Sequence, residues 1–375
     1  MTRTRTVFLA ASMAVVLLFS GALLASRGTT DGLFRALGNL AEVIHLVETE
    51  YVDELNQEAL SLALDAGLVE PLDRSAAVLP PDRVDDYLEL VASPPPYGFG
   101  LSSRLGAAAV QFVFPGSPAE AAGLAAWEVI ELVEGVNSRG RPLWQIRLEL
   151  MDHERRGKPV RLTVLDREVD ERREVVLEPG EWPLRPAAAE QRDGATVIRV
   201  EALADSSVAA IAALVPEGGD LILDLRELHW GLEAEAIALA DHFVDDGVLG
   251  AWQGRRAGSR SYAATAGTVK RQLPLVLVGS GTVGAGEILA SALQRHGAVL
   301  VGQKTGGQAP YMNLVRDGDV AVWMPVGQWL RADEQPISGN GLEPAEAVEA
   351  VADGEGDPVL ERALEILGRE LEKAA

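Results

Sequence analysis

Hydrophobic and polar positions along the chain predict a series of distinct segments. Residues 7–25 form an almost unbroken apolar run of about the length that spans a bilayer. Over residues 33–52 apolar side chains recur with helical spacing, which predicts an amphipathic helix. Two more helices are predicted over residues 57–69 and 82–91, the second after a Pro-Pro pair. The three predicted helices that follow the apolar run together form a small helical arm.

A β-rich module is predicted after a proline-rich boundary at residues 93–96. Short aliphatic and β-branched runs, separated by turn residues, are typical of strands. The expected strands lie at residues 108–112, 129–133, 160–165 and 173–177, with a helix over residues 143–151.

The C-terminal half alternates strand and helix patterns. Strands are expected at residues 195–200, 221–226, 248–252, 275–278 and 299–302, and helices at 206–214, 233–243, 287–296 and 357–371. The alternation predicts a parallel-rich sheet covered by helices, so the fold class is α/β within an α+β multidomain chain. A polar loop, or a pair of strands, is expected over residues 258–267. The last helix is amphipathic and is expected either to pack on the domain or to self-associate.

One stretch organises the C-terminal half. A buried strand over residues 275–278 runs into a glycine-rich turn, and Glu287 then opens a helix. Free backbone N–H groups and the positive end of the helix dipole make such a turn a favourable place for chemistry. The residue at the sharpest point of this turn is Gly284.

The same turn has the outward form of a dinucleotide fingerprint, Gly279-x-Gly281-x-x-Gly284. That motif calls for an acidic residue at the end of the next strand, but the chain reads Gln303-Lys304 there. A dinucleotide-binding oxidoreductase is therefore the weakest alternative, and close backbone packing accounts for the same glycines. No cofactor is expected.

Composition narrows the possible partners. The formal net charge of −23 argues against nucleic acid and anionic membrane surfaces, whose phosphates the chain would repel. The chain has no cysteine, which excludes disulfides and thiolate chemistry. No group of His and carboxylate residues has the spacing of a metal site, so none is expected.

The charges around residues 7–25 predict an orientation. Arg3 and Arg5 precede the apolar run and only Arg27 follows closely, which places the N-terminus in the cytoplasm. The best small-x-small cleavage site, residues 20–22, lies inside the run, which favours an uncleaved anchor over a signal peptide. The remainder of the chain is then extracytoplasmic, on the periplasmic or cell-surface side.

The β-rich module resembles a PDZ domain. The most specific part is residues 116–124, Gly-Ser-Pro-Ala-Glu-Ala-Ala-Gly-Leu. By this resemblance Gly98, Phe99, Gly100 and Leu101 form the loop that holds a peptide carboxylate, while the peptide adds as a strand to the sheet edge. Residues 126–128 read Ala-Trp-Glu where that family usually has Gly-Asp. A PDZ fold kept only as a structural module is the alternative.

The whole chain resembles the carboxy-terminal processing peptidases, or tail-specific proteases, whose α/β core is related to the crotonase-like ClpP fold. The resemblance rests on the order of segments and on four motifs, at residues 221–226, 279–294, 302–307 and 337–344. It implies a signal anchor at 1–30, a helical arm at 31–93, a PDZ-like domain at 94–180, a tail-specific protease domain at 181–350 and a C-terminal helix at 351–375.

The family's chemistry is a Ser–Lys dyad, in which a desolvated lysine takes the proton of the attacking serine. By the resemblance, the serine position falls on Gly284, the lysine position on Gln308 and a supporting glutamine on Met312. The implied oxyanion donors are the N–H groups of Ala285 and Gly231. Residues 227–231 read Glu-Leu-His-Trp-Gly in place of the usual Asn-x-Pro-Gly-Gly, so only the final glycine is kept.

Glycine offers no nucleophile, and a glutamine amide does not accept a proton at ordinary pH. The resemblance therefore implies a degenerate, non-catalytic member that binds peptide or protein C-termini and acts as a scaffold or regulator, alone, as a homodimer or with an active homologue. An active serine endopeptidase with a site displaced to Ser280, Thr282 or Lys304 is the runner-up. His229 with Asp224 or Glu227 is a further candidate acid–base pair, but no nearby serine completes a catalytic triad. A purely structural assembly module is the third reading.

Overall fold

The computed structural model describes residues 35–374, apart from short segments at 53–59, 62–63, 65–66, 70–72, 74, 105, 167–168, 267–272, 319 and 350–355. It divides into two compact units, Met1–Leu62 and Ala63–Ala375. The predicted anchor at residues 7–25 lies outside the described residues. Among the helices that are described, none is both long and apolar enough to cross a membrane. In the first unit a helix over residues 35–50 follows the predicted amphipathic pattern.

The second unit begins with the arm. Strand β1 (Ala77–Leu79) leads through a 3-10 turn (Pro81–Arg83) into helix α3 (Val84–Ala92), close to the helix predicted after the Pro-Pro pair. Ion pairs from Arg83 to Asp152 and from Arg155 to Asp86, both at 3.1 Å, join this arm to helix α5 (Leu143–Arg155). The arm is therefore fixed to the β-rich module.

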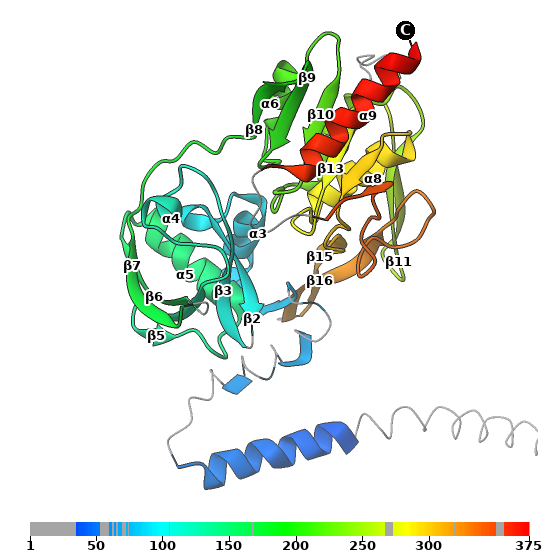
Figure 1. Cartoon of the computed structure of the whole chain (residues 1–375). Coiled ribbons are helices and arrows are strands. Elements are labelled where there is room, and N and C mark those ends of the chain that lie inside the picture. Colours follow the sequence, from blue (N-terminus) through cyan, green and yellow to red (C-terminus); the bar gives the residue numbers. More distant parts are fainter. Residues whose placement is uncertain are drawn as a thin grey trace, which may run out of the picture. The chain divides into compact units, whose positions relative to one another are not determined.

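The β-rich module is an antiparallel sheet in the order β2-β3-β4-β6-β7 (Figure 1). Its strands are β2 (Phe99–Arg104), β3 (Ala107–Val113), β4 (Val129–Val133), β6 (Val160–Asp166) and β7 (Glu171–Leu177), and the short β5 (Val136–Asn137) pairs with β4. Helix α4 (Pro118–Ala121) and helix α5 cover it. Ile146 and Leu150 of α5 pack on Ile130 and Leu162 of the sheet because alternate strand residues face one side.

The C-terminal half contains the predicted parallel-rich sheet, in the order β17-β14-β13-β10-β9-β8, with only β8 antiparallel. The strands are β8 (Ala187–Arg192), β9 (Ala195–Val200), β10 (Leu221–Asp224), β13 (Leu275–Val278), β14 (Leu300–Gly302) and β17 (Glu346–Ala347). Helices α6 (Ser207–Leu214), α7 (Glu233–Asp241), α8 (Ala285–Arg295) and α9 (Pro358–Ala374) cover it.

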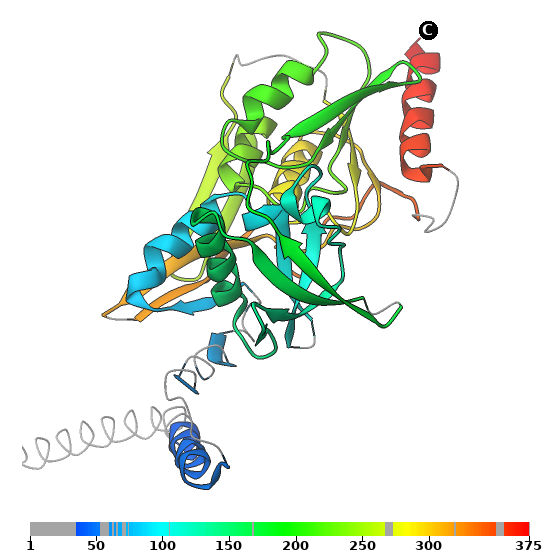
Figure 2. The same ribbon diagram turned by 90° about the vertical axis from the view of Figure 1, so that its left-hand side faces the viewer.

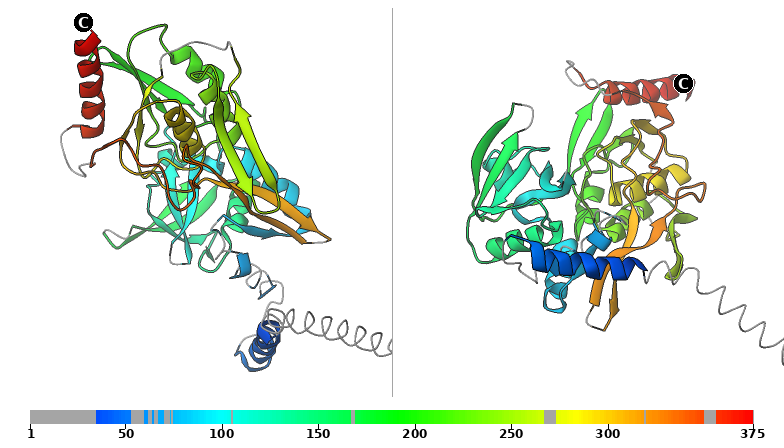
Figure 3. Two further views of the ribbon diagram at one scale, coloured as in Figure 1. Left: turned by 90° about the vertical axis from the view of Figure 1, so that its right-hand side faces the viewer. Right: turned by 90° about the horizontal axis from the view of Figure 1, so that it is seen from below.

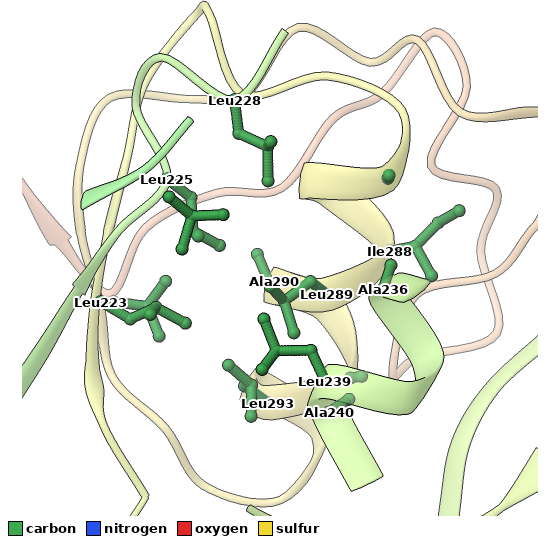
Figure 4. Close-up of a cluster of buried hydrophobic side chains, with 14 of the residues drawn as sticks. Leu223, Leu225, Leu228, Ala236, Leu239, Ala240, Ile288, Leu289, Ala290 and Leu293 are labelled. Carbon is green, nitrogen blue, oxygen red and sulfur yellow. The ribbon is translucent and has the colours of Figure 1, made fainter. Parts of the chain in front are cut away.

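The inner strands β10, β13 and β14 are buried on both faces of this sheet, which explains why each is an almost continuous apolar run. Leu221 and Leu223 belong to the core with α7 and α8, which Figure 4 shows around Leu289 and Leu293. Ile222, between the two leucines, belongs to the core with α9. The last helix therefore packs on its own sheet, and Figure 1 shows it (red) crossing β10 and β13.

A second, antiparallel sheet joins distant parts of the chain. Its order is β1-β16-β11-β12, with β15 also paired to β16. The strands are β11 (Val248–Gly254), β12 (Gly258–Ala263), β15 (Pro310–Asp317) and β16 (Val320–Trp329). Figure 2 shows β1 (blue) beside the orange β15–β16 hairpin, and Figure 3 shows the yellow-green β11–β12 hairpin next to it. The sequence pattern missed this long orange hairpin, because much of it is exposed and lacks a strict apolar alternation.

Candidate functional site

Gly284 is the N-cap of α8 and has φ 54° and ψ −116°, a conformation that favours glycine. A Cβ atom at this position would have the backbone oxygen of Gln308 as its nearest neighbour, at 3.8 Å. The fold therefore brings positions 284 and 308 together, as the family resemblance implies. There is room for a side chain at 284, and the Gln308 side chain is exposed.

Glu287 holds these two positions in place. It is fully buried one turn into α8 and accepts hydrogen bonds from the Gly307 and Gln308 amides, both at 2.7 Å, and from the Thr305 hydroxyl. The Gly284 amide also donates to it, as the N-cap amide donates to the side chain of the third helical residue in a capping box. Burial raises the pKa of Glu287, and the four donors oppose that shift. Sequence reasoning treated Glu287 only as a helix start, although its position three residues after the N-cap was a usable signal.

The two implied oxyanion positions also meet. A Cβ atom at Gly231 would lie 3.0 Å from the Ala285 Cβ. Gly231 is held by a bridge to Leu203, and the neighbouring Leu232 amide donates to the Leu203 carbonyl at 2.7 Å. The rebuilt segment 227–231 thus still brings its last glycine to the start of α8.

The side chains considered for a displaced site have other contacts. Thr282 is buried, donates its hydroxyl to the Leu225 carbonyl at 2.8 Å and accepts from the Gly279 amide at 3.0 Å. Lys304 is about half exposed and pairs with Glu343 at 2.6 Å. Ser280 is exposed on the turn, and Met312 lies on β15 within 3.9 Å of the Ser75 hydroxyl.

His229 connects the rebuilt segment to the β-rich module. Its Nε2 lies 2.9 Å from the Glu227 carboxylate, and its ring stacks on Phe112 of β3 with centroids 5.2 Å apart. Phe112 also packs on Phe114, which stacks on Trp182. His229 therefore serves here as a packing residue between the two parts of the unit.

The four residues of the predicted carboxylate loop, Gly98–Leu101, are all buried. The Gly98 carbonyl accepts from the Phe114 amide at 2.8 Å. The Leu101 carbonyl, on the edge strand β2, accepts from the Arg147 guanidinium of α5 at 2.7 Å. Arg147 thus occupies an acceptor that an added peptide strand would use, and sequence reasoning did not find it.

A group of four aromatic rings packs in or against the same core as Ala285, the first residue of α8. Trp252 stacks on Tyr311 at 3.9 Å and Tyr262 on Trp329 at 5.5 Å, so four strands contribute one ring each. Burial raises the pKa of Glu233, the first residue of α7, to about 7. The Trp329 indole N–H opposes this shift without reaching the geometry of a full hydrogen bond. Sequence reasoning missed this group because its members are far apart along the chain.

Within the described part of the chain, no cluster of three or more His, Cys, Asp or Glu side chains could hold a metal ion. The site as described consists of the turn at Gly284, the segment at Gln308 and the neighbouring donors. These residues form the frame of the candidate site, and Gly284 at the apex of the turn has no side chain.

Comparisons with known proteins agree with this frame. Residues 197–348 match the family model described as Peptidase family S41. A carboxyl-terminal-processing protease of a Picosynechococcus species is 30% identical over 245 residues, which cover 62% of this chain and 59% of the relative. The carboxy-terminal processing protease CtpA of Bacillus subtilis is 25% identical over 330 residues, covering 85% of this chain and 70% of the relative.

A solved structure titled photosystem II D1 C-terminal processing protease superposes with a TM-score of 0.64 and 21% identity, covering 86% of this chain and 89% of that one, so it shares the fold. This chain spans between 57% and 62% of the length of three curated relatives that it matches. The sequence match, the relatives and the shared fold point to one family: residues 197–348 match peptidase family S41, and the chain is similar to carboxyl-terminal processing proteases.

Proposed function

We propose that this chain is a non-hydrolytic member of its family that binds peptide or protein C-termini. The observation that carries the proposal is that Gly284 and Gln308, at the two positions that the resemblance assigns to the dyad, lie next to each other. A serine hydroxyl and a lysine amine are the reacting groups of the family's dyad, and neither is present at these positions. The neighbouring N–H groups of Ala285 and Gly231 are the donors that would hold a peptide carbonyl or carboxylate.

We further infer that residues 94–180 form a PDZ-like module with Gly98–Leu101 as its carboxylate loop. The order of strands and helices in the module supports this inference. A peptide strand that adds to β2 has to replace Arg147 at the Leu101 carbonyl, so binding there includes a rearrangement of this side chain.

The predicted anchor at residues 7–25 and its flanking charges support an extracytoplasmic location for the folded part. In that location, a protein that holds termini without cleaving them acts as a scaffold or as a regulator of an active homologue. The opposing hypothesis, a displaced dyad, finds less support because Thr282 and Lys304 have other partners.

The proposal is tested on the full chain in detergent. A fluorophosphonate probe and a casein turnover assay are expected to give no signal, while labelled peptides with free C-termini bind and their amidated counterparts bind more weakly. Labelling or turnover that disappears in Ser280→Ala, Thr282→Ala or Lys304→Ala would establish the displaced site instead. Equal binding of free and amidated peptides would contradict recognition of termini.

A further inference from the structure

The chain is acidic overall, but one stretch of it contains no acidic residue. The chain carries 56 acidic and 33 basic residues, yet no Asp or Glu occurs from Gly247 to Gly286. The basic residues in this stretch are Arg255, Arg256, Arg260, Lys270 and Arg271. This stretch therefore carries five positive charges and no negative one, within a chain of net charge −23.

The three arginines of this stretch that the structure describes lie on one hairpin. Arg255 and Arg256 form the turn between β11 and β12, and Arg260 lies on β12. All three are exposed, and none forms an ion pair with a carboxylate of the described residues. Their charges are therefore available to a ligand.

Strand β12 also has an open edge. Among the described strands it pairs only with β11 and ends the order β1-β16-β11-β12. An edge strand presents unpaired N–H and C=O groups that accept a further strand. Figure 3 shows this hairpin (yellow-green) at the margin of its sheet.

A row of aromatic side chains connects this edge with the candidate site. In the strand register Arg260 lies opposite Trp252, and Trp252 lies opposite Trp329. Tyr311, which stacks on Trp252, comes three residues after Gln308. The Arg260 guanidinium lies 4.7 Å from the Tyr262 ring centroid, so the cation stands on this aromatic row.

We propose that the open edge of β12, with Arg255, Arg256 and Arg260, binds an acidic extended peptide segment by strand addition. The inference deepens the proposed function and rests on it, because it names the class of peptide that this site selects. Backbone hydrogen bonds to β12 supply affinity for an extended segment, and the arginines supply selectivity for Asp and Glu side chains. Because the rest of the chain is acidic and repels acidic peptides, such a peptide is expected to bind at the hairpin.

The test measures fluorescence anisotropy of labelled peptides on the full chain in detergent. Three peptides share length and C-terminus and carry an acidic, a neutral or a basic stretch. The acidic peptide is expected to bind most tightly, and its affinity falls as salt rises to about 0.15 M because exposed charges are screened. Arg255→Gln, Arg256→Gln and Arg260→Gln each weaken it about threefold, and the triple variant roughly twentyfold.

The control variant is Arg316→Gln. Arg316 is an exposed arginine on β15 of the same sheet, with Asp85 as its partner at 3.8 Å, and its replacement is expected to leave the affinity unchanged. A peptide N-methylated at alternate residues keeps the charges but cannot add a strand. Its weaker binding, together with slower hydrogen exchange of residues 258–263 in the complex, identifies strand addition.

Several outcomes would overturn the inference: equal affinity for the three peptides, equal loss in Arg316→Gln, or binding of phosphatidylglycerol vesicles or an oligonucleotide in preference to the acidic peptide. The proposed function fails separately, through fluorophosphonate labelling of the wild-type chain. An active enzyme that still needs the three arginines to bind acidic peptides would keep the present inference.

Discussion

Placing a serine at position 284 tests the interpretation of the turn directly. Gly284→Ser puts a hydroxyl at the position that the family resemblance assigns to the nucleophile, with its Cβ 3.8 Å from the Gln308 carbonyl oxygen, an ordinary contact. The positive φ of 54° costs a non-glycine residue about 1–3 kcal/mol. We therefore expect a folded variant with a melting temperature a few degrees lower, and the same decrease for Gly284→Ala.

Position 281 in the same turn provides a steric comparison. A Cβ there would lie 2.5 Å from the Arg226 carbonyl oxygen and 2.6 Å from the His229 ring, so the backbone has to shift. Gly281→Ser is expected to destabilise the protein more than Gly284→Ser, although its φ is not positive. The opposite order, measured by thermal unfolding, would refute the geometry assigned to the turn.

Reactivity then depends on a base. In Gly284→Ser/Gln308→Lys the new lysine replaces an exposed side chain, so its pKa stays at about 10.4. The pKa of a desolvated amine would be lower. Only about 0.1% of it is neutral at pH 7.5, and this fraction rises about tenfold per pH unit.

The assay is the rate of fluorophosphonate labelling between about pH 7 and pH 10, near the pKa of the new lysine. We expect no labelling of the wild type or of Gly284→Ala, and slow labelling of Gly284→Ser. The double variant should be faster than the single one throughout, with a rate that rises with pH as more of the lysine becomes neutral. A double variant no faster than Gly284→Ser at any pH would refute the pairing of positions 284 and 308.

Three further predictions concern buried charges. Below about pH 4.5 the Glu233 carboxyl is neutral in both the folded and the unfolded chain, and the free energy of unfolding falls as pH rises toward the folded pKa of about 7. The change in unfolding free energy caused by Glu233→Gln, measured by urea unfolding, should therefore be roughly 1–3 kcal/mol more favourable at pH 8 than at pH 4. Glu287→Gln turns an amide group toward backbone donors, which should cost about 2–4 kcal/mol and speed hydrogen exchange of the 307–308 amides. Arg226→Met removes hydrogen bonds of 2.8 Å to the buried Asp224 and of 2.7 Å to Asp357, which caps α9. It should lower the free energy of unfolding by about 3 kcal/mol and let α9 unfold before the rest of the domain.

An exposed pair provides the comparison for these variants. Arg192→Gln removes an ion pair with Glu190 on β8, where both side chains are about half exposed, and should change stability by less than about 0.5 kcal/mol. If Arg226→Met were as mild as Arg192→Gln, the network around Asp224 would not hold α9. A pH-independent effect of Glu233→Gln would contradict the raised pKa of that carboxyl.

The predicted carboxylate loop of the β-rich module shows how far local motifs reach. The PDZ resemblance points to Gly98–Leu101; the last three of these residues begin strand β2, and Gly98 ends the 3-10 turn before it. That the Leu101 carbonyl is already bonded to Arg147 depends on how α5 packs on β2, which no local pattern encodes. The same holds for Phe112 and His229, which stack although they lie far apart in the chain.

The elements whose apolar periodicity reflects burial, such as β13, α8 and the strand at Leu221–Asp224, could be predicted from the sequence alone. The residues at the turn could be predicted too, because a strand, a glycine-rich turn and a helix are local features. The contacts of Gln308 with Gly284, of Glu287 with both, and of the rings from four strands near Glu233 are visible only in the folded chain. The physical reason is that these contacts join segments distant in sequence, whose approach is set by sheet order and packing and not by the preferences of neighbouring residues.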